Sequence, residues 1–195
     1  MLIYKIKKMN RYLILLFTFA IAPIVTNAQA PVSVQMHYGG NFQFDGDTDY
    51  VILDFENKSD MDIYDDMMMN VFFLYKQPND VVSGVNGKMI KVRGGTNISF
   101  VDEDGEKRKG SVYYRICFWI KNGKVKVKAP VLEDVTYLSS NYPVIRREIK
   151  PSELASIYGE SSDQSGLTEL EDYLSYEINY ILGLVSGTYP YHQNW

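Results

Sequence analysis

The chain has 195 residues, of which 46% are hydrophobic, 14% aromatic and 23% charged. This composition is typical of a soluble globular protein, and it excludes overall disorder, a collagen-like fibre and a multi-span membrane protein. Two histidines and one cysteine leave almost no material for a Cys/His zinc site or a disulfide framework. We therefore predict neither a metal nor a cofactor.

Residues 1–30 have the three zones of a secretory signal. A cationic start contains Lys5, Lys7, Lys8 and Arg11, and an apolar run over residues 12–25 is followed by the small residues of Ala28-Gln29-Ala30. The run of about 14 residues is shorter than the roughly 20 that cross a membrane as a helix. The sequence therefore predicts a cleaved signal and a mature chain that begins near Gln29 or Pro31.

The prediction is an exported protein, periplasmic or secreted. The only cysteine, Cys117, is far from the expected cleavage point, so we do not expect the lipid attachment of a lipoprotein. Without the signal, 16 Lys and Arg remain against 24 Asp and Glu, a net charge of −8. This negative charge argues against nucleic acid as a partner.

The first half of the mature chain predicts two strands and a helix. Residues 31–49 are polar, with one expected strand over residues 32–37, and residues 50–55 are β-prone between turn formers. Ser59 and Asp62 have the spacing of an acidic capping box at the start of a helix over residues 60–76, which Pro78-Asn79-Asp80 ends. The expected core stripe of this helix is Tyr64, Met67, Met68, Val71, Phe72 and Tyr75.

A series of short β-prone runs follows, which predicts an antiparallel meander. The runs cover residues 81–85, 88–93, 97–101, 111–121 and 124–131. Gly94-Gly95 is expected to break the second run from the third. Asn122-Gly123, between two alternating runs, is the strongest hairpin signal in the chain.

The C-terminal part predicts an irregular stretch over residues 141–166, with a short helix at residues 152–158, and then a long helix over residues 167–185. The apolar stripe of the long helix is Leu167, Leu170, Leu174, Ile178, Ile181, Leu182 and Val185, with Glu169, Glu171, Asp172 and Glu177 outside it. Residues 31–195 then form one domain, a two-layer α+β sandwich in which two long helices cover one face of an antiparallel sheet of about five or six strands.

Three stretches resemble a family of exported bacterial proteins, described as a domain of unknown function with a TATA-binding-protein-like (TBP-like) fold. They are residues 50–66, in which Lys58-Ser59-Asp60 leads into the helix, residues 74–83 with Pro78-x-Asp80-Val81, and residues 114–127 with Lys121-Asn-Gly-Lys124. The resemblance covers residues 45–135 and implies a TBP-like core with the helix of residues 167–185 as an extension. None of the shared motifs is catalytic, so it implies no functional residue.

Neither a calcium loop nor a catalytic centre is indicated by residue spacing. Asp45, Asp47, Asp49 and Glu56 have the spacing of calcium ligands, but Tyr50 stands where the loop needs glycine, which favours an acidic turn. The two histidines, His37 and His192, lie in weakly ordered ends, and no spacing places a base beside Cys117 or a serine. We therefore expect a protein that is not an enzyme.

The hairpin at Asn122-Gly123 predicts which side chains share a face. A two-residue loop pairs Trp119 with Lys126 and directs Phe118 and Val127 toward the helices. The other face then carries Tyr113, Arg115, Trp119, Lys124, Lys126 and Lys128. Residues 87–128 hold 11 Lys and Arg against 4 acids, so the sheet is basic while the rest of the chain is acidic.

These six residues are the candidate binding site. The lysines either keep a sheet edge soluble or form an open cationic and aromatic face for an acidic partner: an anionic glycan, a lipid headgroup or an acidic protein. We favour an exported binding or interaction module of the second kind. A small carboxylate-based hydrolase and a carrier of an apolar ligand between the sheet and residues 167–185 stay open as alternatives.

Overall fold

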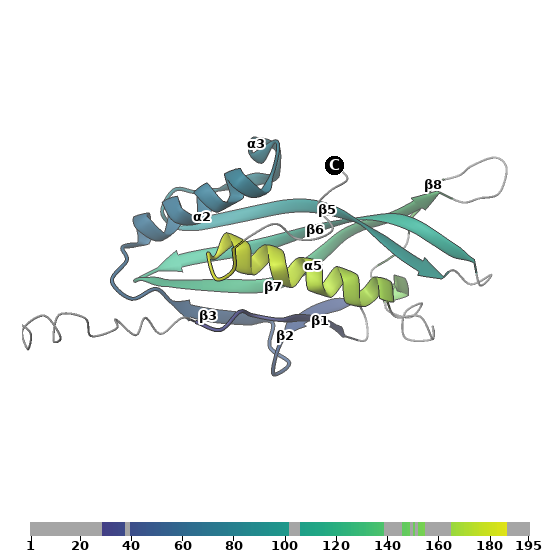
Figure 1. The fold of residues 1–195 in the computed structure, drawn as a ribbon, viewed down its shortest axis with the longest axis horizontal. Helices are drawn as coiled ribbons and strands as arrows, with labels where there is room; N and C mark the ends of the chain where they lie inside the picture. The colour runs from purple at the N-terminus through teal and green to yellow at the C-terminus, as the bar shows by residue number, and fades with distance from the viewer. Residues whose placement is uncertain are drawn as a thin grey trace, which may run out of the picture.

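The computed structural model of the protein describes residues 29–37, 40–101, 106–138, 146–148, 150, 152–154 and 165–186 (Figure 1). The strands are β1 (Val34–His37), β2 (Asn41–Phe44), β3 (Tyr50–Asp54), β4 (Val82–Val85), β5 (Met89–Val101), β6 (Lys107–Lys121), β7 (Lys124–Leu138) and β8 (Arg146–Glu148). The helices are α2 (Asp60–Leu74), α3 (Pro78–Val81) and α5 (Ser165–Ile181). The predicted signal and His192 lie outside the described residues.

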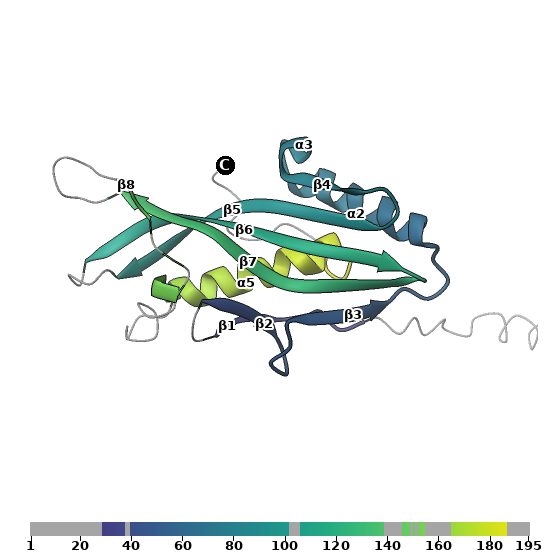
Figure 2. The same ribbon diagram turned by 180° about the vertical axis from the view of Figure 1, so that it is seen from behind.

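The main sheet is antiparallel, with the strand order β3-β7-β6-β5-β4, and β8 pairs with the far end of β7. Strands β1 and β2 form a separate hairpin that lies alongside β7 and α5. Helices α2 and α5 contact each other and both cover the same side of the sheet (Figure 1), which Figure 2 shows from behind. The predicted two-layer α+β architecture is confirmed. Among the described residues, no helix has the length and apolar character to cross a membrane.

The turn between β6 and β7 has the predicted geometry. Asn122 and Gly123 both have positive φ, 54° and 71°, as a two-residue type I′ loop requires. Trp119 pairs with Lys126, and Phe118 pairs with Val127. Phe118 and Val127 are fully buried on the helix side, so the predicted orientation of the sheet is confirmed.

Gly94 and Gly95 do not break a strand, which makes the prediction at this point wrong. β5 runs through both glycines, with Gly94 opposite Tyr114 and Gly95 opposite Tyr113 on β6. A Cβ atom at Gly94 would lie 2.8 Å from Cε2 of Tyr114, and closer still to its Cζ and Oη. The glycines therefore leave room for tyrosine rings on the neighbouring strand.

Helix α2 begins with the predicted capping box. The amide of Asp62 donates to Oγ of Ser59 at 3.1 Å, and the carboxylate of Asp62 accepts from the amide of Ser59 at 3.1 Å. The hydrogen bond from the Ser59 side chain is the main cause that lowers the pKa of Asp62. The helix ends at Leu74, two residues earlier than predicted, and α3 adds one turn at Pro78–Val81.

We expect the substitution Ser59→Ala to lower the free energy of unfolding by about 1 kcal/mol, because it removes the acceptor for a helix N-terminal amide. A chemical denaturation series on both proteins measures the difference. An unchanged midpoint would show that the cap contributes nothing to stability.

The side chains of α2 that reach the core form a narrower stripe than predicted. Ile63, Met67 and Val71, spaced four residues apart, are the buried ones, whereas Tyr64 and Met68 are half-buried. Phe72, predicted in the core, is 52% exposed. The apolar character of this helix therefore extends onto its solvent side.

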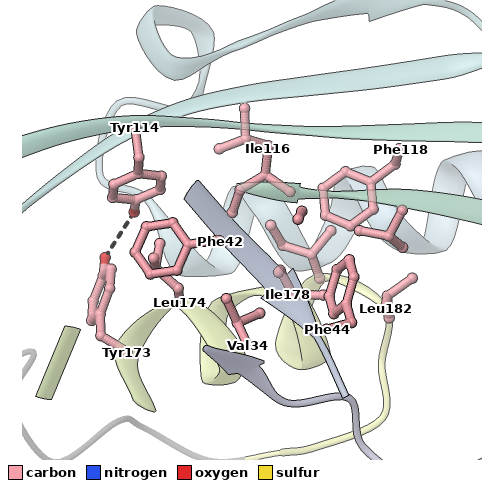
Figure 3. Close-up of a cluster of buried hydrophobic side chains, with 14 of the residues drawn as sticks. Val34, Phe42, Phe44, Tyr114, Ile116, Phe118, Tyr173, Leu174, Ile178 and Leu182 are labelled. Atoms are coloured by element: carbon pink, nitrogen blue, oxygen red, sulfur yellow. Dashed lines mark hydrogen bonds between the residues drawn. The ribbon is translucent and has the colours of Figure 1, made fainter. Parts of the chain in front are cut away.

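The β1–β2 hairpin completes the apolar core. Val34, Phe42 and Phe44 are buried against Leu174 and Ile178 of α5 (Figure 3). The sequence predicted one strand at residues 32–37 and missed β2, and the weakly ordered end expected around His37 is instead part of β1. Likewise, β8 lies in a stretch that was predicted to be irregular.

Along the edge of β1, side chains of α5 accept the backbone hydrogen bonds that a neighbouring strand would otherwise accept. The amides of Val32, Val34 and Met36 donate to Asn179, Ser175 and Glu171, at 2.8, 2.9 and 2.7 Å. The acceptors are four residues apart on the helix, which is about 6 Å along its axis, and the donors are two residues apart on the strand, which is about 6.7 Å. The two spacings therefore nearly match over three successive hydrogen bonds. The hydrogen bonds fix the N-terminal part of the domain against α5.

Candidate functional site: the outer face of the sheet

The outer face is the side of the main sheet opposite α2 and α5. Trp119 is 37% exposed there and Ile52 is 57% exposed, whereas Ile116 and Phe118 on the helix side are completely buried. Among the described residues, no helix or strand packs on this face. The sequence placed Tyr113, Arg115, Trp119, Lys124, Lys126 and Lys128 together here, and each of them is at least partly accessible.

Strand register arranges the outer face in rows across the sheet. The apolar row contains Val85, Met89, Trp119, Lys126 and Ile52, from β4 to β3. Next to it, the cationic row contains Lys91, Cys117, Lys128 and Tyr50, and the arginine row contains Arg93 and Arg115. Neighbouring rows are about 7 Å apart along the strands, so aromatic, aliphatic and cationic groups lie close to one another on this face.

Part of the positive charge is matched inside the molecule. Lys124 forms an ion pair with Asp54 on β3. Glu133 accepts from Arg93 at 2.6 Å and lies 3.2 Å from Arg115. The register of β6 with β7 shifts between Tyr113 and Tyr114, so that Glu133 has no partner residue on β6. This irregularity is a β-bulge, and a bulge changes the direction of the side chain of its extra residue, here Glu133.

Lys91, Lys126 and Lys128 carry unmatched charge at the centre of the outer face. Within the described ranges, none of the three has a carboxylate within 4 Å. Lys126 instead lies over the ring of Tyr50, with Nζ 3.8 Å from the ring centroid, a cation–π contact. A cavity of about 370 Å³ lies beside it, lined by Asp49, Tyr50, Trp119, Lys126 and Lys128. Two ammonium groups, two aromatic rings and one carboxylate thus line one depression, with a net positive charge.

Cys117 does not have the properties of a nucleophile. Burial of its half-buried side chain raises the pKa of the thiol, although Arg115, Lys91 and Lys128 act in the opposite direction. A reactive cysteine needs its pKa lowered. In addition, no three His, Cys, Asp or Glu side chains of the described segments are grouped to hold a metal ion.

A second polar cluster lies inside the core and corrects a sequence prediction. Glu177 was expected outside the apolar stripe of α5, but it is completely buried. Its two carboxylate oxygens accept hydrogen bonds from the hydroxyls of Tyr75 and Tyr114. The hydroxyl oxygens of Tyr114 and Tyr173 lie 3.2 Å apart (Figure 3). The cluster joins the end of α2 to β6 and α5.

Burial dominates the ionisation of this cluster. It raises the pKa of Glu177 to about 7, while the hydrogen bonds from Tyr114 and Tyr75 act against it. Burial also raises the pKa of the Tyr75 and Tyr114 hydroxyls, so both stay protonated donors. Because Tyr114 and Glu177 have no exposed surface, the carboxylate at the centre of the cluster is closed to solvent, and its hydrogen bonds link three elements of the fold.

Sequence reasoning missed the outer-face residues that come from other strands. Tyr50, Ile52 and Lys91 reach the site only through the register of β3 and β5 with the central hairpin. Residues 50–55 were predicted as a strand, but nothing local in the sequence gives the partner of a strand 70 residues away. The Glu133 partner depends on a bulge and was equally hidden.

No protein-family model and no curated protein matches this chain. Two solved structures are similar to it. A TBP-like protein from Parabacteroides distasonis ATCC 8503 is 12% identical, with a TM-score of 0.40, over 68% of this chain and 90% of that one. A DUF4468 family protein from Bacteroides ovatus ATCC 8483 is 15% identical, with a TM-score of 0.45, over 79% of this chain and 92% of that one. Their descriptions agree with the family resemblance in the sequence, and at these TM-scores no functional residue is carried over to this chain.

Proposed function

We propose that the protein is a non-enzymatic binding domain whose outer face holds an acidic protein surface. One observation carries the proposal: Lys126 and Lys128 form no ion pair among the described residues and flank a depression walled by Tyr50 and Trp119. Asp49 also lines the depression, so its two ammonium groups outnumber its one carboxylate. Tryptophan, tyrosine and arginine are the residue types that dominate binding energy at protein interfaces. The outer face combines all three with unmatched lysine charge.

Exposed aliphatic groups favour a protein partner over a glycan or a lipid headgroup. Ile52 and Val85 stand at the two ends of the apolar row, and both are more than half exposed. Sugar hydroxyls and phosphate oxygens would leave these side chains in water or bury them against polar atoms. A protein surface supplies carboxylates and apolar side chains together. Its carboxylates can pair with the lysines of the outer face, and its apolar side chains can cover the exposed aliphatic ones.

The geometry gives less support to the two alternatives. A carboxylate hydrolase needs an accessible acid with a shifted pKa, and the carboxyl group with the large shift, Glu177, is enclosed. Burial also raises the pKa of the partly exposed Glu171, but this carboxylate accepts a hydrogen bond from a backbone amide of β1 and so has a structural role. A carrier needs an apolar cavity between the sheet and α5, where Ile116, Leu174 and Ile178 belong to one packed cluster. The open outer face is therefore the better candidate.

Trp119 itself can report binding. In a Trp195→Phe background it is the single tryptophan, and its fluorescence is titrated with an acidic random copolymer of glutamate and tyrosine. We expect Lys126→Gln/Lys128→Gln to weaken binding about fivefold at low salt, because each exposed charge contributes under about 1 kcal/mol. Lys124→Gln is the matched control on the same face, and its effect should be smaller since Asp54 already pairs with this lysine.

Two results would contradict the proposal. Equal effects of the double variant and the Lys124→Gln control would show that the unmatched lysines have no special role. Tighter binding of a sulfated glycan or of anionic vesicles than of the copolymer would assign the face to one of those partners instead.

The proposal also includes an exported location, which rests on the charged and apolar zones of residues 1–30. We expect N-terminal sequencing of the protein from the exported fraction to begin near Gln29 or Pro31. Exported protein that still begins near Met1 or Met9 would contradict cleavage of the signal.

A further inference from the structure

The solvent side of α2 carries a stripe of exposed side chains. The stripe consists of Asp62, Asp65, Asp66, Met69, Phe72 and Phe73, spaced three and four residues apart, and we call it the α2 stripe. Phe73 is 73% exposed and Met69 is 57% exposed. An exposed apolar cluster of this kind, bordered by charge, is characteristic of an interaction surface.

The α2 stripe and the outer face have complementary chemistry. The first half of the stripe is acidic and the second half is apolar. Asp66 is paired with Lys58 at 2.6 Å, and Asp62 belongs to the capping box. Asp65 is therefore the carboxylate of the stripe without a partner among the described residues. On the outer face, the apolar row lies beside the cationic row and the arginine row, in which Lys91 and Lys128 are unmatched. Each surface therefore has one charged half of opposite sign and one apolar half.

The distance between the charged half and the apolar half is also similar on the two surfaces. The three acids centre about seven residues before the three apolar side chains, which is about 10 Å along a helix. On the sheet, the apolar row lies about three residues from the midpoint of the cationic and arginine rows, again about 10 Å along the strands. A helix laid along the strands can thus place both halves in contact at once.

We infer that the α2 stripe of one copy of this chain docks on the outer face of a second copy. This inference rests on the proposed function and names its partner. Because α2 packs on the opposite side of the sheet from the outer face, the contact is heterologous and leaves one free surface of each kind on every pair. Association therefore continues head to tail instead of stopping at a symmetric dimer.

Sedimentation of the purified protein over a range of concentrations measures this association. We expect species larger than a dimer at about 20 mM salt, and a shift toward monomer at about 500 mM, because screening weakens the charged half of the contact. Phe73→Ser should also shift the equilibrium at least fivefold toward monomer without unfolding, since the side chain is exposed.

A charge exchange tests the pairing directly. The variant Asp65→Lys/Asp66→Lys makes the stripe basic, and Lys91→Glu/Lys128→Glu makes the cationic row of the outer face acidic. Each variant alone brings like charges together and should stay monomeric, whereas an equimolar mixture restores opposite charges at every contact and should associate. Asp45→Lys/Asp172→Lys changes the same number of acids elsewhere and should associate like the unmodified protein.

The outcomes separate this inference from the proposed function. A protein that is monomeric at all concentrations, yet binds the glutamate–tyrosine copolymer through Lys126 and Lys128, overturns the self-association and retains the proposed function. A mixture that fails to associate while each unmixed variant still does would place the contact on other surfaces. Loss of both copolymer binding and association overturns both.

Discussion

Replacing Glu177 by glutamine should remove most of the pH dependence of stability between about pH 4.5 and 7. The carboxyl group has an ordinary pKa of 4.5 when the chain is unfolded, and burial raises its pKa to about 7 in the folded protein. Over this window the unfolded chain loses the proton while the folded protein keeps it. The free energy of unfolding therefore falls as the pH rises, by about 3 kcal/mol, and levels off above pH 7.

The side-chain amide of the Glu177→Gln variant stays neutral at every pH, so the variant should have no such fall. Urea unfolding at pH 5 and pH 8 gives the comparison: the unmodified protein should lose stability at pH 8 and the variant should change little. The groups that face Glu177 are Tyr75, Tyr114 and Tyr173, and burial moves the pKa of Tyr75 and Tyr114 upward, away from this window. Glu169→Gln, on the same helix, controls for the remaining charges.

Equal pH slopes in both proteins would show that Glu177 is ionised in the folded state throughout. A stability of the unmodified protein that rises with pH up to about pH 4.5 and stays level above it, with no such rise in the variant, would mean that the tyrosine hydrogen bonds outweigh the cost of burial. Either result would change the role assigned to the cluster, from a neutral hydrogen-bonded link to a buried anion.

Features that depend on a few neighbouring residues were predictable from the sequence. The Ser59–Asp62 capping box and the Asn122-Gly123 turn each rest on residues within one turn, whose side chains and φ angles determine the geometry. Once the turn fixed the register, strict alternation assigned the side chains of residues 113–121 and 124–128 to a face, and it failed only at and beyond the bulges of β7. The six predicted residues of the outer face follow from this one local signal.

The sequence contained a partial indication that Glu177 is buried, because this residue lies at helical spacing from other buried residues of α5. Leu170, Tyr173, Glu177 and Ile181 are spaced three and four residues apart, and all are buried. The predicted stripe included Leu170 and Ile181, but it ran between them through Leu174 and Ile178 and treated the acid as solvent-facing. Its partners Tyr75 and Tyr114 are distant in sequence, so the hydrogen bonds that make burial tolerable could not be anticipated.

Exposed apolar residues of α2 were misplaced for a related reason. Periodicity counts apolar side chains at helical spacing and assigns them to the core, but the sheet accommodates only the stripe of Ile63, Met67 and Val71. Phe72 and Phe73 follow Val71 directly and therefore point elsewhere. The helix has more apolar residues than one buried stripe can contain, and this excess indicates that it has a second apolar surface.

The glycine pair of β5 gives the sharpest test of the fold. We expect Gly94→Ala to lower the free energy of unfolding by about 3 kcal/mol or more, a large share of the roughly 5–15 kcal/mol that stabilises an ordinary domain. The new methyl group would overlap the ring of Tyr114, and this ring cannot move aside because it is completely buried and its hydroxyl donates to Glu177. Displacing it would leave a buried carboxyl group without one of its partners, which adds to the steric cost.

Gly95→Ala is the matched control, one residue along the same strand. A Cβ atom there would lie 3.2 Å from Cδ1 of Tyr113, whose ring is exposed on the outer face and free to shift into solvent. The cost should stay under about 1 kcal/mol, since alanine also restricts the unfolded chain more than glycine does. Thermal and urea unfolding of the two variants should therefore differ strongly. Equal losses would mean that the strand tolerates no side chain at either position, because the backbone itself requires glycine, and that the tyrosine rings are not the cause.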